Sequence, residues 1–313
     1  MKIFAHNFDS SSNSGPNKFS RQLFMNLMQD EKYSMTSQQE EADVEFCLIQ
    51  QSVHKKKPML LRLDGIYFNS EQDFKQQNTP INFAYENADT VVFQSEFNKA
   101  LTEHWFGEHK NNHVIHNAYF GERIKDETFR IQLGDREIWS CASSWRPHKR
   151  LIDNVRYFLK WAPESSVFMI AGLGYTEEET SKIQLLLSEN NFKDKKIIML
   201  GDLNYYDLRQ LYDASTTFVH LAYLDHCPNV VVDAYAHGCQ IICTDSGGTN
   251  EVSWSCKLVA EKPWDFSPIP LYKPPELDLE NIIDQHISHK PNIEKLAENC
   301  LEKYKKAFEQ IQQ

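Results

Sequence analysis

The amino-acid sequence predicts an α/β protein in which two doubly wound parallel-sheet domains face each other across a cleft. Short apolar runs alternate with amphipathic helical patterns along the chain, and this alternation is typical of a parallel sheet covered by helices on both faces. The length of 313 residues fits two domains of roughly 150 residues each. Sheets of this kind bind ligands at the carboxyl ends of their strands, so we expect a binding site in the cleft.

The first part of the chain begins with a predicted buried strand over residues 2–6, which leads into a loop rich in Ser, Asn and Gly. Apolar residues then recur at helical spacing over residues 19–28, which indicates an amphipathic helix. Ser95 is expected to cap a later helix over residues 97–105. Further apolar runs predict strands over residues 44–49, 59–63, 90–93 and 114–115.

The predicted linker between the domains covers residues 117–135, where periodicity is lost and charged residues dominate. It divides the chain into a first domain over residues 1–133 and a second over residues 134–292. Asn204 is expected to cap one of the helices of the second domain, and a Pro-rich passage precedes two final helices. The expected strands of the second domain are 137–140, 167–171, 197–200, 217–220, 240–244 and 257–259, and its expected helices are 151–161, 177–190, 205–214 and 228–237.

Charge and cysteine content exclude several classes of function. The chain has 33 Lys and Arg against 44 Asp and Glu, a formal net charge of −11. This charge disfavours binding of nucleic acid, and any phosphate must be bound by a local group of positive charges or N–H donors. Its 7 cysteines form no CxxC pair and no zinc template, which indicates free thiols and no metal. Because no apolar run is long enough for a signal peptide or a spanning helix, we expect a cytoplasmic protein with at most peripheral membrane contact.

The segment over residues 223–238 is the most informative for chemistry. Pro228 suits the first position of a helix. The start of that helix would leave three backbone N–H groups without partners, those of Asn229, Val230 and Val231. Such a helix end binds phosphate well. Asp225 precedes the helix and Asp233 lies roughly 7 Å further along it, an arrangement that suits a diphosphate joining two polyhydroxylated rings.

This segment resembles the donor-binding signature of glycosyltransferase family 4, whose members are retaining transferases with the GT-B fold. Asp225 and Asp233 have the spacing of the E-x7-E pattern of that family, and residues 243–252 match its Thr-Asp-x-Gly-Gly-x-x-Glu-Val turn. The chain departs from the family in having Asp at both acidic positions. Each acidic side chain is therefore one methylene shorter than in the family, which affects the choice of donor sugar and the activity.

Looser matches extend the resemblance over most of the chain. Residues 114–118 resemble the V-I-x-N-G run that ends the first domain of the family, and residues 143–150 resemble its diphosphate-clamping loop. By this resemblance Arg146 and Lys149 are the clamp, with Arg150 as a competitor. Leu203 would lie where the backbone meets the nucleotide base, and Gly15 would lie near the donor phosphate.

The resemblance implies two Rossmann-like domains, with the acceptor bound by the first and the donor by the second. A last helix over about residues 293–313 would pack back on the first domain. The implied activity is metal-independent transfer of a sugar, with retained configuration, from a nucleotide-diphosphate sugar to an acceptor hydroxyl in glycan synthesis. Asp233 would bind the ribose and Asp225 the donor sugar. Asp64, which ends a predicted strand, is a candidate for orienting or deprotonating the acceptor.

Two alternatives remain open at this point. One is a nucleotide-sugar epimerase or phosphorylase with the same fold. The other is a catalytically silent protein that binds a nucleotide sugar or a glycan, which the two Glu-to-Asp changes and the short chain leave open. Donor hydrolysis would distinguish a transferase from a silent binder.

Overall fold

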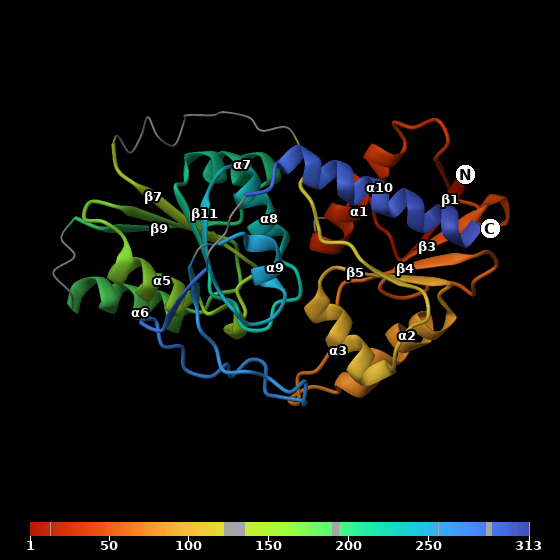
Figure 1. Ribbon diagram of the computed structural model, residues 1–313. Coiled ribbons are helices and arrows are strands. Elements are labelled where there is room, and N and C mark those ends of the chain that lie inside the picture. The colour runs from red at the N-terminus through yellow and green to blue at the C-terminus, as the bar shows by residue number, and fades with distance from the viewer. Residues whose placement is uncertain (13, 122–134, 190–193, 256, 286–289, 313) are drawn as a thin grey trace.

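The computed structural model describes residues 1–312 apart from residues 13, 122–134, 190–193, 256 and 286–289. It contains two domains, each built around one sheet (Figure 1). In the first sheet the strand order is β2-β1-β3-β4-β5-β6, and all neighbours are parallel. Its strands are β1 (Lys2–His6), β2 (Ser34–Thr36), β3 (Val44–Leu48), β4 (Met59–Leu63), β5 (Thr90–Phe93) and β6 (Asn112–Val114).

The helices of the first domain begin where the sequence provides capping groups. The Ser95 hydroxyl accepts a hydrogen bond from the Asn98 N–H at 3.0 Å, and the Asp73 carboxylate accepts one from the Gln76 N–H at 3.0 Å. The apolar faces of these helices pack on the sheet, whose central strands β3 and β4 are buried throughout. The helices are α1 (Gly15–Leu27), α2 (Phe74–Asn87) and α3 (Glu96–Phe106), together with the short 3₁₀ turn η1 (Gln39–Glu41).

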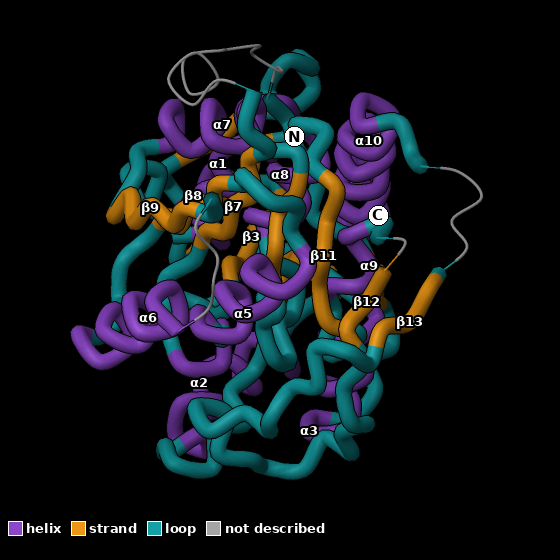
Figure 2. Tube along the Cα trace, turned by 90° about the vertical axis from the view of Figure 1, so that its left-hand side faces the viewer, coloured by secondary structure: helices purple, strands orange, loops and turns teal. Residues whose placement is uncertain are grey.

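The second sheet has the strand order β13-β12-β11-β10-β7-β8-β9. Its pairs are parallel except for the edge strand β13, which is antiparallel to β12 (Figure 2). Its strands are β7 (Ile138–Ala142), β8 (Val167–Ala171), β9 (Lys196–Gly201), β10 (Thr217–His220), β11 (Gln240–Thr244), β12 (Lys257–Val259) and β13 (Ile282–Asp284).

Helices cover both faces of the second sheet. The Asn204 side chain caps α7, because its oxygen accepts a hydrogen bond from the Asp207 N–H at 3.0 Å. The helices are α5 (Leu151–Trp161), α6 (Glu177–Glu189), α7 (Tyr205–Ala214), α8 (Asn229–Ala236) and α9 (Thr249–Ser253), with a 3₁₀ turn η2 (Pro147–Lys149) before α5.

After the second sheet the chain returns to the first domain. The last helix, α10 (Ile293–Gln312), lies along the first domain against α1, β3 and β4. Its buried face, which includes Tyr304 and Phe308, is part of the same apolar core as Phe19 and Phe46. Both termini therefore lie on the first domain (Figure 1).

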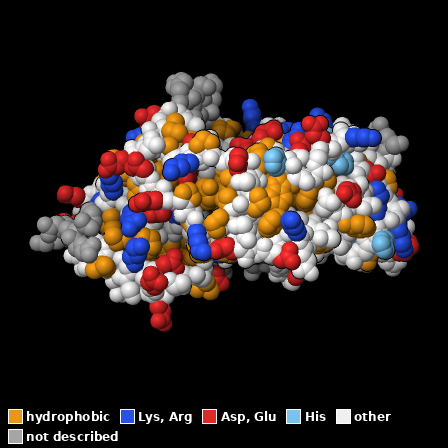
Figure 3. Space-filling view, turned by 90° about the horizontal axis from the view of Figure 1, so that it is seen from below, with side chains coloured by type: hydrophobic (Ala, Val, Ile, Leu, Met, Phe, Trp, Pro, Cys, Tyr) orange, Lys and Arg blue, Asp and Glu red, His pale blue; other side chains and the backbone are white. Residues whose placement is uncertain are grey.

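Earlier in the chain, residues 261–275 also reach the first domain, and we call this segment the strap. It leaves β12, runs along the first domain and returns to β13 (Figure 1). Ile269 forms a parallel bridge with Asn69, and the Phe266 carbonyl accepts a hydrogen bond from the Trp105 indole at 2.9 Å. Seen from below, hydrophobic side chains gather along the middle of the face on which the strap lies (Figure 3).

The structure confirms the predicted α/β fold and corrects it in places. Only one helix, α10, follows the strap in the described residues, and β13 lies where the other predicted helix was expected. The short strand β2 and the turn helix α9 were not predicted. The domain boundary and most of the predicted linker fall at residues 122–134, outside the described residues. Among the described helices, none is long and apolar enough to span a membrane.

Candidate active site

A cavity of about 390 Å³ lies between the two domains, at the carboxyl ends of both sheets. The first domain contributes Gly15, Pro16, Asp64 and Gln94 to its walls. The second domain contributes the loop after β7, the end of β10 and the start of α8. These residues are Ser143, Ser144, Arg146, Lys149, His220 and the run 225–230. Most of the residues singled out from the sequence therefore line one cavity.

The start of α8 points backbone donors at this cavity. Pro228 is the N-cap of the helix and not its first residue, which moves the helix start by one position. The Val231 N–H, predicted to be free, donates a hydrogen bond to the Pro228 carbonyl at 3.1 Å. The N–H groups of Asn229 and Val230 donate to no acceptor within the described part of the chain. The 8-residue helix α8 begins with these two free donors, so its N-terminus carries a partial positive charge at the cavity.

Asp225 is paired within the cavity wall. Its Oδ2 atom lies 2.5 Å from Lys149 Nζ and 3.0 Å from His220 Nε2. Burial opposes ionisation of the carboxyl group, yet the Lys149 charge and the hydrogen bond from His220 hold its pKa well below the usual range. Burial also lowers the pKa of His220. The two residues predicted to bind sugar and diphosphate are thus each other's partners in this structure.

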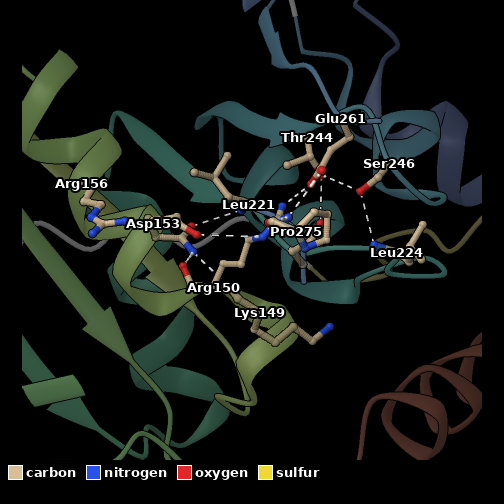
Figure 4. A network of polar contacts seen from close by, with 12 residues as sticks. Lys149, Arg150, Asp153, Arg156, Leu221, Leu224, Thr244, Ser246, Glu261 and Pro275 are labelled. Carbon is tan, nitrogen blue, oxygen red and sulfur yellow. Dashed lines mark hydrogen bonds and ion pairs between the residues drawn. The ribbon is translucent and has the colours of Figure 1, made fainter. Parts of the chain in front are cut away.

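Arg146 and Arg150, the two candidate arginines of the loop, have different environments. Arg146 is exposed, lines the cavity and forms no ion pair with any described residue. Arg150 is buried, pairs with Glu261 and donates a hydrogen bond to the Pro275 carbonyl at 2.7 Å. Figure 4 shows this network, with the Lys149 side chain pointing away from it. Arg150 therefore holds both ends of the strap and, unlike Arg146, does not line the cavity.

Asp64 lies just beyond β4, on the first-domain side of the cavity. Burial raises its pKa, and its ion pair with the fully buried Arg62 opposes that rise. Gly65 follows with a φ of +140°, and a Cβ atom there would lie 2.6 Å from the His226 ring. Only glycine allows this approach of the two domains.

Gly15 allows a second close approach. Its carbonyl accepts a hydrogen bond from the Asn229 side chain at 3.0 Å, and a Cβ atom on Gly15 would lie 3.2 Å from Asn229 Nδ2. The Asn117 side chain also donates to Asn229 Oδ1 at 2.8 Å and accepts from Arg62 at 2.9 Å. The start of α8 is therefore fixed against the first domain by a chain of buried and part-buried polar contacts.

Asp233 and Leu203, two of the predicted donor-binding residues, lie outside the cavity walls. Asp233 is buried, and its carboxylate pairs with Lys18 of the first domain at 2.8 Å. Leu203 is partly buried against the apolar core of the second domain. The structure thus brings together Gly15, Asp64, Arg146, Lys149, Asp225, Pro228, Asn229 and Val230, and leaves these two apart.

Sequence reasoning missed His220, His226 and Lys18. His220 could have been found, because it ends β10 and so lies at the edge of the sheet that faces the cleft. His226 follows Asp225 directly, and burial lowers its pKa to about 4. No pattern in the sequence points to Lys18. In the part of the chain that the structure describes, no group of three or more His, Cys, Asp or Glu side chains could hold a metal ion.

Comparison with known proteins bears on the second domain and on the fold. Residues 141–259 match the family model of glycosyl transferases group 1. Sucrose-phosphate synthase from Thermosynechococcus elongatus is similar in structure, with 13% identity, a TM-score of 0.70 and 99% of each chain covered. HepE from Anabaena, solved with UDP and glucose, has 13% identity and a TM-score of 0.61, with 86% of this chain and 88% of that chain covered.

A putative UDP-N-acetylglucosamine 2-epimerase from Listeria monocytogenes also shares the fold, at 10% identity and a TM-score of 0.55, with 87% of this chain and 85% of that chain covered. No match was found among curated proteins. The chain therefore has the GT-B fold, and residues 141–259 of its second domain match the family model of glycosyl transferases group 1.

Proposed function

We propose that the protein is a glycosyltransferase that moves a sugar from a nucleotide-diphosphate sugar to an acceptor hydroxyl with retained configuration. The observation that carries the proposal is a group of donors in the interdomain cavity that have no partner among the described residues. The Asn229 and Val230 N–H groups at the start of α8 and the Arg146 guanidinium are all part of its wall. The match to glycosyl transferases group 1 covers the same segment.

The proposed reaction places negative charge where these donors lie. The bond between the anomeric carbon and the donor phosphate breaks, and the electron pair stays on the leaving diphosphate. Arg146 and the two helix N–H groups stabilise that charge without reorganising, which is the main source of rate acceleration in such sites. Lys149, held by Asp225 at 2.5 Å, adds a further positive charge beside them.

The acceptor hydroxyl bonds to the anomeric carbon from the face that the diphosphate leaves, so the configuration is retained. Its proton passes to an oxygen of the departing phosphate, and no covalent enzyme intermediate forms. Asp64, in the first-domain wall of the cavity, orients the acceptor hydroxyl by accepting a hydrogen bond from it until the proton passes to the phosphate. Asp225 accepts hydrogen bonds from the donor sugar hydroxyls and orients the ring.

The proposal is tested with a panel of nucleotide sugars and the purified protein. A transferase releases free sugar and nucleoside diphosphate slowly from its own donor when no acceptor is present. NMR of the first-formed sugar shows whether the anomeric configuration is retained, and an unchanged rate in excess EDTA is expected. Interconversion of sugar epimers would favour the epimerase alternative, and binding without turnover would favour the silent binder.

A further inference from the structure

We propose that Lys18 is a latch on the donor site, which competes with the ribose of the nucleotide for Asp233. The inference rests on the proposed function, in which Asp233 binds the ribose. It begins from the ion pair between Lys18 Nζ and Asp233 Oδ2, which joins α1 of the first domain to α8 of the second across 2.8 Å. The side chains are 16% and 6% exposed, so this contact is largely shielded from water and salt.

Further contacts beside the ion pair join α1 to α7 of the second domain. The Lys18 ammonium lies 4.0 Å from the centre of the Tyr205 ring, at the start of α7. Gln22, one helical turn after Lys18, donates a hydrogen bond to the Tyr205 hydroxyl at 3.1 Å. One face of α1 thus contacts both α7 and α8 of the other domain.

The two roles of Asp233 exclude each other. A carboxylate that recognises a vicinal diol accepts a hydrogen bond from each hydroxyl and needs both of its oxygens for this. Because Oδ2 is already bonded to Lys18, the ribose can bind only after the ammonium has left. Asp233 also lies outside the cavity walls, so α1 must move away from α8 before the carboxylate is reached.

The latch therefore makes donor binding dependent on separation of α1 from α8. Part of the binding free energy of the nucleotide is used to break the Lys18 ion pair. The apparent affinity for the nucleotide is therefore lower than it would be without the pair. Removal of the cation, with the length of the side chain kept, should raise the affinity of the site for a nucleoside diphosphate. A residue with a merely structural role would not give a gain in affinity.

The test uses Lys18→Met in the full-length protein, titrated by calorimetry with UDP, GDP and ADP in turn. For the nucleotide that binds, we expect affinity to rise by roughly fivefold or more, and stopped-flow measurements should show the gain in the association rate. Lys75→Met is the control, because Lys75 is an exposed residue of α2 far from this contact. In an Asp233→Asn background, Lys18→Met should give no gain.

Each other outcome counts against a defined part of the account. Unchanged or weaker binding by Lys18→Met overturns the latch alone. Both Asp233→Asn and Lys18→Met lack the ion pair, so nucleotide affinity in Asp233→Asn that equals that of Lys18→Met overturns the ribose role of Asp233 and with it the competition. Absence of binding by both the wild type and Lys18→Met overturns the donor site itself. If Lys18→Met does not fold, Lys18→Gln serves for the same comparison.

Discussion

The Lys149 ammonium lies 2.5 Å from the Asp225 carboxylate, although the two residues are 76 positions apart in the sequence. The pair joins the loop after β7 to the loop before α8, and His220 completes it from the end of β10. Donor binding at this site must therefore act on a preformed, charged contact and not on two separate side chains.

The first prediction concerns Asp225→Asn. An amide oxygen can still accept a hydrogen bond from Lys149, so we expect the fold to be retained. The charge that orients both Lys149 and the donor sugar is lost, and a small misplacement in an active site costs roughly 100-fold in rate. Turnover with the identified donor should fall by about that factor. Turnover within about threefold of the wild-type rate would remove Asp225 from the catalytic group.

The second prediction concerns Arg146→Ala. Because Arg146 is exposed and unpaired among the described residues, thermal stability should not change. Loss of its charge should reduce turnover at least ~10-fold, about 1.4 kcal/mol of transition-state stabilisation. Arg156→Ala is the matched control, since Arg156 is an exposed arginine on α5. Equal rates in the two variants would contradict the diphosphate role of Arg146.

The third prediction distinguishes the structural role of Arg150 from the diphosphate-binding role of Arg146. Arg150→Met leaves the buried Glu261 without its partner and frees the Pro275 carbonyl at the end of the strap. Breaking a buried ion pair typically costs about 3–5 kcal/mol of unfolding free energy. Denaturant titration should show that loss, whereas nucleotide affinity of the folded protein should stay the same. A variant with normal stability and weakened nucleotide binding would return Arg150 to the donor site.

The fourth prediction is a dependence of stability on pH. Burial lowers the pKa of His148 to about 3, from an ordinary value of 6.5. Below pH 6.5 the unfolded chain therefore binds a proton that the folded protein excludes, so stability falls as pH decreases. The slope is about 1.4 kcal/mol per pH unit for each such histidine.

Denaturant titrations at pH 7, 6 and 5 measure this slope. His148→Gln should give a shallower fall between pH 6 and pH 5 than the wild type, because one of the contributing groups is gone. His226, with its pKa lowered to about 4, would account for part of the slope that remains. Parallel curves for the two proteins would show that His148 takes up its proton in the folded state as well.

Local features of the fold could be predicted from the sequence. The Asn204 cap fixes the start of α7 at Tyr205, and the apolar run at residues 217–220 forms β10. Both depend on neighbouring residues only. The edge strand β13 could not be predicted in this way, because a short run such as Ile282–Asp284 becomes a strand only through pairing with β12.

The candidate site was predictable to a similar extent. The start of α8 and its flanking Asp225 could be placed from Pro228 and the order of residues around it. The choice between Arg146 and Arg150 could not, because it depends on the left-handed backbone of Arg150, at φ 53°, and on burial beside Glu261. The partner of Asp233 could not be found either, since Lys18 is 215 positions away in the sequence.

The central claim is that the interdomain cavity binds the diphosphate of a nucleotide sugar. Equilibrium titration of wild-type protein and Arg146→Ala with UDP, GDP, ADP and dTDP tests it most directly. The account predicts that one of these nucleotides binds the wild type and that its affinity drops at least ~10-fold in the variant, about 1.4 kcal/mol. Equal binding by both proteins, or no binding of any nucleotide at millimolar concentration, would contradict it.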